Sequence, residues 1–171
     1  MLYSAIPCWM IYLATFKGMH KPYTTGSLSH KSNRMNQDST AQTASQERPH
    51  PFADLLGLTV DSRGNGKCEC SLKFNEKFLN PNDIVHGGVI YSLADNGMGG
   101  ALQSVLDEDE LCATIELKIT YLHAAGHHDL LCKSIVLKKG RRVAMLESEI
   151  YSGGKMVAKA TGSFAVFHAK T

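Results

Sequence analysis

Apolar and polar residues alternate along several stretches of the chain, as they do in β-strands with one buried face. In residues 67–74 (KCECSLKF) every second residue is apolar, and the shared face carries Cys68, Cys70, Leu72 and Phe74. Residues 58–62 precede this strand, and the turn Arg63–Gly66 contains the Asn-Gly pair typical of a tight hairpin. Four more strands are predicted at residues 112–122, 129–138, 142–151 and 155–168, separated by turn-forming residues.

The segment His86–Gln103 has the period of an α-helix instead. At 100° per residue one broad side carries Val89, Ile90, Leu93, Ala94, Gly97, Met98, Ala101 and, beyond the segment, Val105. Residues 50–58 (HPFADLLGL) predict a shorter helix with Phe52, Leu55 and Leu56 on one side. The order of two strands, one long helix and four strands predicts an α+β fold with a mostly antiparallel sheet. One helix covers only one face of such a sheet, so we expect a dimer.

The folded domain is expected to span residues 51–168. Residues 1–50 contain an apolar start, Leu2–Phe16, that is shorter than the roughly 20 residues needed to cross a bilayer. It also lacks the preceding basic segment of a signal peptide, and the polar residues that follow are typical of disorder. We interpret this segment as a disordered leader, or as translation from upstream of a start at Met19 or Met35. A membrane-associated leader is the alternative.

Composition narrows the classes of partner. The 171 residues carry a net charge of +2, with 43% hydrophobic and 20% charged residues, which argues against nucleic acid or a charged membrane surface as the main partner. The five cysteines show no CxxC pair and no zinc-ligand spacing. An odd number of cysteines without a secretory signal favours a reducing, cytoplasmic setting.

The long helix carries one carboxylate, Asp95, at the boundary of its apolar side. Its closest angular neighbours include Gly88, Ser92 and Gly99, all of them small. Each glycine inside a helix costs about 0.5–1 kcal/mol relative to alanine. The cluster Gly97, Gly99 and Gly100 is therefore expected to permit close approach of the sheet, a partner subunit or a ligand.

The start of the helix, His86-Gly87-Gly88, leaves backbone N–H groups unhindered at the positive end of the helix dipole. Such an end can bind an anion, or the oxygen of a carbonyl that becomes negative during attack. Combined with Asp95, it suggests hydrolysis of an activated acyl group. The alternative is a tight connection into the helix with a merely solvated aspartate.

A longer motif, NPNDIVHGGVIYSLAD at residues 80–95, resembles the hot-dog-fold acyl-CoA thioesterases, specifically the PaaI-type (phenylacetate-degradation) branch of the 4-hydroxybenzoyl-CoA thioesterase superfamily. That pattern has Asn or Gln six residues before the His of HGG and an acidic residue nine after it. The resemblance continues through residues 113–122, 140–145 and 156–165 and covers roughly residues 51–168. Asp83, where many relatives have Gly, departs from the pattern, as does Asn96, where some have a smaller residue.

The resemblance implies a central helix wrapped by a curved sheet of about six strands, with subunits paired edge to edge and active sites at the interface. The N–H of Gly88 would polarise the thioester carbonyl, while His86 and Asn80 would orient it or the attacking water. Asp95 of the partner subunit would act as general base or nucleophile. Thr114 would help to hold the water.

Substrate binding is further assigned to Gly87 and to Arg141 or Arg142, whose guanidinium groups suit the phosphates of coenzyme A; a solvated basic turn is the alternative. No metal or cofactor is expected, because one base and one oxyanion donor suffice to hydrolyse a thioester. Coenzyme A enters only as part of the acyl-CoA substrate. The adjacent His127 and His128 are expected to point apart, which disfavours a metal site.

The remaining alternatives concern function and assembly. A non-catalytic acyl-CoA-binding module could share this fold, but it would have no use for the base Asp95. A hot-dog dehydratase is disfavoured by the spacing of the motif. A homodimer is the minimum assembly, and the resemblance favours a homotetramer without a membrane span. Tyr91 and Tyr121 are interpreted as packing residues, and the alternation within residues 114–121 is taken as regular.

Overall fold

The computed structural model describes residues 50–168. The expectations about a leader and about a start at Met19 or Met35 lie outside the described residues. The elements are α2 (Pro51–Leu56), β1 (Leu58–Gly64), β2 (Lys67–Leu72), the 3₁₀ turn η1 (Glu76–Phe78), α3 (Gly87–Gln103), β3 (Glu110–Tyr121), β4 (Leu130–Lys139), β5 (Val143–Ser152) and β6 (Lys155–His168).

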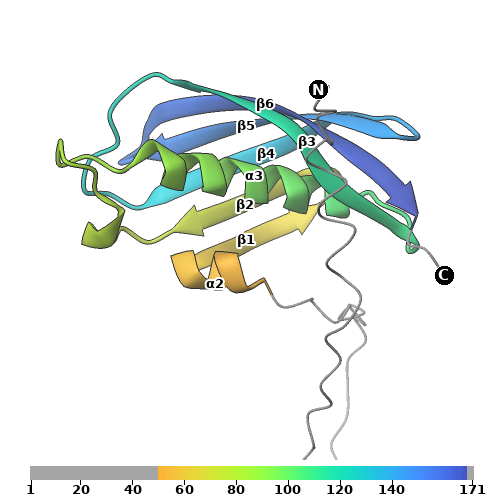
Figure 1. Cartoon of the computed structure of the whole chain (residues 1–171), viewed down its shortest axis with the longest axis horizontal. Helices are drawn as coiled ribbons and strands as arrows, with labels where there is room; N and C mark the ends of the chain where they lie inside the picture. Colours follow the sequence, from red (N-terminus) through yellow and green to blue (C-terminus); the bar gives the residue numbers. More distant parts are fainter. Residues whose placement is uncertain (1–49, 169–171) are drawn as a thin grey trace, which may run out of the picture. The chain divides into compact units, whose positions relative to one another are not determined.

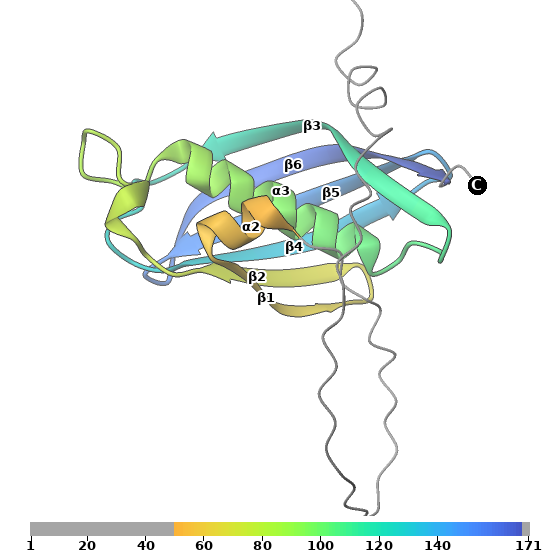
Figure 2. The ribbon, with the colours of Figure 1, turned by 60° about the horizontal axis from the view of Figure 1, so that its bottom comes forward.

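The six strands form one antiparallel sheet in the order β1-β2-β4-β5-β6-β3. Figure 1 and Figure 2 show α3 lying along the concave face of this curved sheet, with the short helix α2 beside β1. The α+β class, the single long helix and the antiparallel six-stranded sheet are thus confirmed. Of the six strands described, β1 and β3 form the edges, and each has one strand neighbour.

The first hairpin is tighter than the sequence predicts. β1 continues through Gly64, so only Asn65 and Gly66 form the turn. Both have positive φ, 52° and 74°, as the type I′ turn requires. Asparagine and glycine tolerate this left-handed conformation, and the turn therefore follows directly from the Asn-Gly pair.

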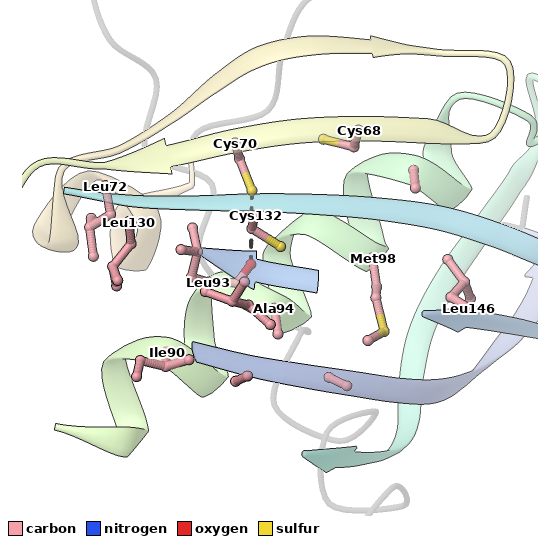
Figure 3. Close-up of a cluster of buried hydrophobic side chains, with 14 of the residues drawn as sticks. Cys68, Cys70, Leu72, Ile90, Leu93, Ala94, Met98, Leu130, Cys132 and Leu146 are labelled. Atoms are coloured by element: carbon pink, nitrogen blue, oxygen red, sulfur yellow. Dashed lines mark hydrogen bonds between the residues drawn. The ribbon is translucent and has the colours of Figure 1, made fainter. Parts of the chain in front are cut away.

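The core lies between α3 and the concave face of the sheet. Cys68, Cys70 and Leu72 line one side of β2 as their alternation predicts, and all are at most 1% exposed. Figure 3 shows this cluster with the labelled side chains of α3 directed into it: Ile90, Leu93, Ala94 and Met98. Leu102 and Gly100 are also buried, beyond the side predicted from the helical projection. The sheet curves around the helix and covers more than one apolar stripe.

α2 contributes less to this core than its sequence suggests. Phe52 and Leu55 share a side of the helix but are 52% and 79% exposed. Ala53 is the buried residue of α2, and Leu56 packs at the margin of the main core. A helix of six residues beside an edge strand has too little sheet surface to cover its apolar side chains.

The glycines of α3 are of two kinds. A Cβ on Gly97 would lie 2.5 Å from Ser134 Oγ and 2.9 Å from Cys132 Sγ, and one on Gly100 would lie 2.8 Å from Cys68 Sγ. These two positions confirm the expected close approach of the sheet. Apart from the backbone of its own helical turns, a Cβ on Gly99 would meet nothing within 4 Å among the described residues. Contact with the sheet therefore does not explain Gly99.

The convex face of the sheet remains open in the single chain. Large apolar side chains are 37–55% exposed at its β4–β5 end and on β6: Ile135, Leu137, Val143, Met145 and Phe167. Exposed apolar groups of this kind often mark an interface, which is consistent with the expected assembly. The dimer and the tetramer stay predictions. Within residues 50–168 no helix has the length and hydrophobicity required to cross a membrane.

The strand β3 departs from the regular alternation expected for residues 114–121. A β-bulge at Ile115 interrupts its pairing with β6 between Thr114 and Glu116. Regular alternation places Thr114 and Tyr121 on opposite faces, because they are seven residues apart. The extra residue in the bulge reverses this relation, and both side chains reach the helix.

Gly97→Ala is expected to lower the free energy of unfolding by about 1–3 kcal/mol, because the added methyl group overpacks the contact with Cys132 and Ser134. Gly99→Ala is the matched control, because Gly99 lies two residues further along the same helix and no side chain of the described residues packs against it. It should raise stability by up to about 1 kcal/mol through helix propensity. Urea unfolding followed by circular dichroism measures both.

A Gly97→Ala variant as stable as the original chain would contradict the close packing of α3 on the sheet. If Gly99→Ala alone destabilises the protein, another chain must lie against that position.

Candidate active site

The loop before α3 places His86 at the N-cap of the helix. Its backbone is extended (φ −61°, ψ 134°), and its imidazole Nδ1 accepts a hydrogen bond from the Gly88 N–H at 2.9 Å. The His86 carbonyl also accepts from the Val89 N–H at 2.9 Å. The N–H assigned to the thioester carbonyl therefore has an acceptor within the chain. Histidine here performs the capping role that Ser, Thr, Asp or Asn usually fills.

Asn80, assigned to orienting the substrate or water, lies in the same loop. Its side-chain oxygen accepts from the Asn82 N–H at 2.8 Å, and its backbone N–H donates to the Ile84 carbonyl at 2.8 Å. The loop is closed behind it by the His86 N–H, which donates to the Phe78 carbonyl at 2.8 Å. Asn80 thus shapes the loop that delivers His86 to the helix N-terminus.

Asp83 occupies the position where the resembling family often has Gly. Its φ of 60° is left-handed, a conformation that aspartate tolerates better than most residues. Its carboxylate lies 3.1 Å from Nε2 of His127, whose ring stacks on Phe74 with centroids 5.0 Å apart. The aspartate thus adopts a left-handed backbone and its side chain contacts His127. His128 instead packs near Gly153, so the two adjacent histidines contact different segments, as predicted.

Asp95 and Thr114 are brought together from α3 and β3. The Thr114 hydroxyl donates to Asp95 Oδ1 at 2.8 Å, and the carboxylate is half-buried. The sequence assigned Thr114 to the attacking water, whereas in the chain it contacts the carboxylate itself. This hydrogen bond fixes the orientation of the Asp95 carboxylate. A general base needs a fixed orientation, because it must take the proton from one direction.

Cys112 lies close to this pair but is a poor candidate for a nucleophile. Burial, and then the negative charge of Asp95, raise the pKa of its thiol. A thiol that stays protonated is weakly reactive, because the thiolate is the attacking species. Asp95 therefore remains the candidate for the reactive group at this position.

Gly88 and Asp95 do not meet within one chain. They are seven residues apart in α3, which puts them on the same side of the helix but about 10 Å apart along its axis. A donor and a base that serve one carbonyl group must each come within about 3–3.5 Å of the reacting atoms. For the two groups to act on one carbonyl group, the second must come from another copy of the chain.

Arg141 and Arg142 lie in the turn between β4 and β5, where both are exposed. The following Val143 pairs with Ala165, at the end of β6 that faces the start of β3. The helix N-terminus lies beside Tyr121, at the opposite end of the sheet and about 23 Å away along β6. The arginines are thus remote from Gly87 in the same chain and nearer to the Thr114 end of β3.

Tyr121, which the sequence suggests is a packing residue, contacts the helix N-terminus. Its hydroxyl donates to the Gly87 carbonyl at 2.8 Å, and the side chain is 50% exposed. The hydroxyl of the neighbouring Tyr91 lies 3.5 Å from the Leu117 carbonyl. The apolar pattern of β3 gave no signal for this contact, since the bulge at Ile115 decides which face Tyr121 occupies.

Comparison with known proteins supplies the family. Residues 82–159 match the model of the thioesterase superfamily. A protein of Pseudomonas aeruginosa, named only provisionally as an esterase, is 30% identical over 119 residues, which are 68% of this chain and 89% of that protein. Acyl-coenzyme A thioesterase 13 of Homo sapiens is 29% identical over 112 residues, 63% of this chain and 79% of that enzyme.

Solved structures agree with the fold. A conserved protein of Pseudomonas aeruginosa superposes with a TM-score of 0.69 and 35% identity, covering 72% of this chain and 99% of the other. Proteins of the PaaI type are also among the solved structures that share the fold. The matched segment contains both the His86-Gly87-Gly88 helix start and Asp95. The chain therefore belongs to the thioesterase superfamily, and its sheet wrapped around one long helix is the hot-dog fold.

Proposed function

We propose that the protein hydrolyses acyl-CoA thioesters to a carboxylic acid and free coenzyme A, as a member of the PaaI-type branch. The observation that carries this proposal is the pairing of Asp95 with Thr114 on the same side of the helix that begins at Gly87 and Gly88. Thioester hydrolysis needs two groups. One is a base, which a hydroxyl holds here, and the other is an N–H donor, which the helix start supplies. The name of the human relative, an acyl-coenzyme A thioesterase, supports the same substrate class.

The active site is composed of two chains. Because Gly88 and Asp95 stand about 10 Å apart on one helix, a two-fold axis between antiparallel helices would bring Gly88 of one subunit opposite Asp95 of the partner subunit. Among the described strands β3 has a neighbour on one side only, so a second copy of β3 can pair with its other edge and continue the sheet. Thr114 lies on that same edge strand.

The reaction begins when the thioester oxygen accepts the hydrogen bond of the Gly88 N–H, which without substrate is donated to His86 Nδ1. The imidazole is then released from its capping bond and, with Asn80 holding the loop, lies beside the bound carbonyl. Water attacks the carbonyl carbon while Asp95 removes its proton. The C–S bond then breaks, and coenzyme A leaves as its thiolate and takes up a proton. In the alternative order, Asp95 attacks first and water hydrolyses the resulting anhydride.

The phosphates of coenzyme A are assigned to Arg141 and Arg142. In one chain these arginines lie toward the Thr114 end of β3, far from Gly87. In the composite site, the subunit that supplies Asp95 and Thr114 would therefore also supply the arginines. The other subunit would supply Gly87, Gly88, His86 and Asn80. Each half of the substrate would then meet a different subunit.

Asp95→Asn should lower kcat at least about 100-fold, because the amide cannot accept the proton of the attacking water. The fold should persist, since an amide oxygen can still accept from Thr114. Free-thiol release from a panel of aryl-, phenylacetyl- and medium-chain acyl-CoAs measures the change. Asp54→Asn, an exposed aspartate on α2, is the matched control and should keep full activity. Turnover by Asp95→Asn within threefold of the original chain would refute the role of Asp95.

Thr114→Val should lower kcat at least about tenfold, because removing a hydrogen bond to a charged group costs roughly 1.5–3 kcal/mol. Thr114→Ser keeps the hydroxyl and should stay within about threefold. The same thiol-release assay measures both variants at saturating substrate. Equal activities of the Val and Ser variants would show that the hydroxyl bonded to Asp95 has no part in turnover.

A mixed dimer tests the composite site. Gly88→Pro removes the donor N–H at a position in the first helical turn, where proline is accommodated. Dimers purified through two different tags, one subunit with Gly88→Pro and the other with Asp95→Asn, should regain about half of the original activity from one intact site. Each variant alone should be inactive. A mixed dimer as inactive as both parents would exclude the composite arrangement.

A further inference from the structure

The peptide group between Gly87 and Gly88 is contacted on both of its polar sides. Its carbonyl accepts a hydrogen bond from the Tyr121 hydroxyl at 2.8 Å, and its N–H donates to His86 Nδ1 at 2.9 Å. The carbonyl of Gly87 and the N–H of Gly88 belong to the same planar unit. Any group that orients the carbonyl therefore also orients the N–H.

This peptide group opens the helix, and its carbonyl is the first within α3 to face the following turn. Glycine stands on both sides of it, and glycine populates conformations that other residues avoid. It also lies in the first turn of α3, where the N–H groups have no partner within the helix. His86 Nδ1 holds its N–H side, and a contact on its carbonyl from outside the helix fixes the other side. The Tyr121 hydroxyl provides that contact from β3, outside the helix.

The glycine at position 87 is itself fitted to this contact. A Cβ on Gly87 would lie 2.9 Å from the Tyr121 hydroxyl oxygen and 3.0 Å from the ring carbon that bears it. Any side chain at this position would push the tyrosine away from the carbonyl. Burial, and then the neighbouring Tyr91, raise the pKa of the Tyr121 hydroxyl, so it remains a proton donor near neutral pH. The glycine and the tyrosine thus form a matched pair.

We propose that Tyr121 is a positioning residue that holds and polarises the Gly87–Gly88 peptide group, so that its N–H faces the position where the thioester oxygen replaces His86 Nδ1 as acceptor. This inference rests on the proposed function, in which the Gly88 N–H is the oxyanion donor. Oxyanion donors act through preorganisation, since a donor already in place need not reorient as charge develops. A hydrogen bond accepted by the carbonyl also polarises the peptide and strengthens the bond that its N–H donates.

The test compares Tyr121→Phe with Tyr91→Phe as the matched control. Tyr91 is the adjacent tyrosine and is 38% exposed, and its hydroxyl lies near Leu117 rather than the helix N-terminus. Loss of one neutral hydrogen bond predicts that kcat of Tyr121→Phe falls about three- to tenfold. KM should stay within about twofold, and the pH profile should keep its shape because Asp95 is unchanged. Tyr91→Phe should match the original chain.

Two further measurements separate positioning from a structural role. The amide proton resonance of Gly88 in the free protein should shift in Tyr121→Phe and stay in place in Tyr91→Phe. Gly87→Ala should lower kcat by displacing the hydroxyl. Combining it with Tyr121→Phe should cost no more than the worse single change, because both remove the same hydrogen bond.

Several outcomes would overturn the role of Tyr121: an unchanged kcat, a rise in KM alone, an equal loss in Tyr91→Phe, or additive losses in the double variant. Failure of the proposed function would look different. In that case the original chain releases no thiol from any acyl-CoA, or Asp95→Asn retains turnover. An active original chain with an inactive Asp95→Asn and a fully active Tyr121→Phe would reject only the positioning role.

Discussion

The close contact between α3 and the sheet is the constraint on which the rest of the structure depends. At Gly97 and Gly100 the helix lies against Cys132, Ser134 and Cys68 with no room for a methyl group. Small side chains on both elements make this approach possible, at a cost in helix propensity that the buried contact offsets. How closely α3 packs on the concave face of the sheet sets the distance from its ends and its sides to the surrounding strands.

Because the helix lies so close, both features of the candidate site are held by β3. Thr114 reaches Asp95 near the middle of α3, and Tyr121 reaches Gly87 at its start. One edge strand thus holds the carboxylate and the helix N-terminus, which stand about 10 Å apart along one helix. An edge strand is also the element most available to a second copy of the chain. In the proposed composite site, support of the two groups and pairing with a second subunit would therefore depend on the same strand.

Much of the candidate site can be read from the chain, because its signals are local. The spacing of His86, Gly87, Gly88 and Asp95 defines a helix start and a carboxylate two turns later, and both lie as predicted. The strand limits and the Asn65-Gly66 turn also follow from local pattern, since alternation and positive-φ preferences act over a few residues. The left-handed backbone of Asp83, by contrast, was not predicted from the sequence and is shown by the structure.

The sequence by itself therefore determined the order of elements, the buried side of β2 and the location of the helix start and its carboxylate. Only the tertiary structure decided which partners those groups meet. The bulge at Ile115 turns Thr114 and Tyr121 to the same face, and no periodic pattern within β3 encodes that change. His86 as a cap on Gly88, and Gly97 against Cys132, are contacts between groups that meet only when the chain turns or the sheet folds over the helix. Local preferences fix the conformation of a segment, whereas packing between segments fixes the chemistry available to its side chains.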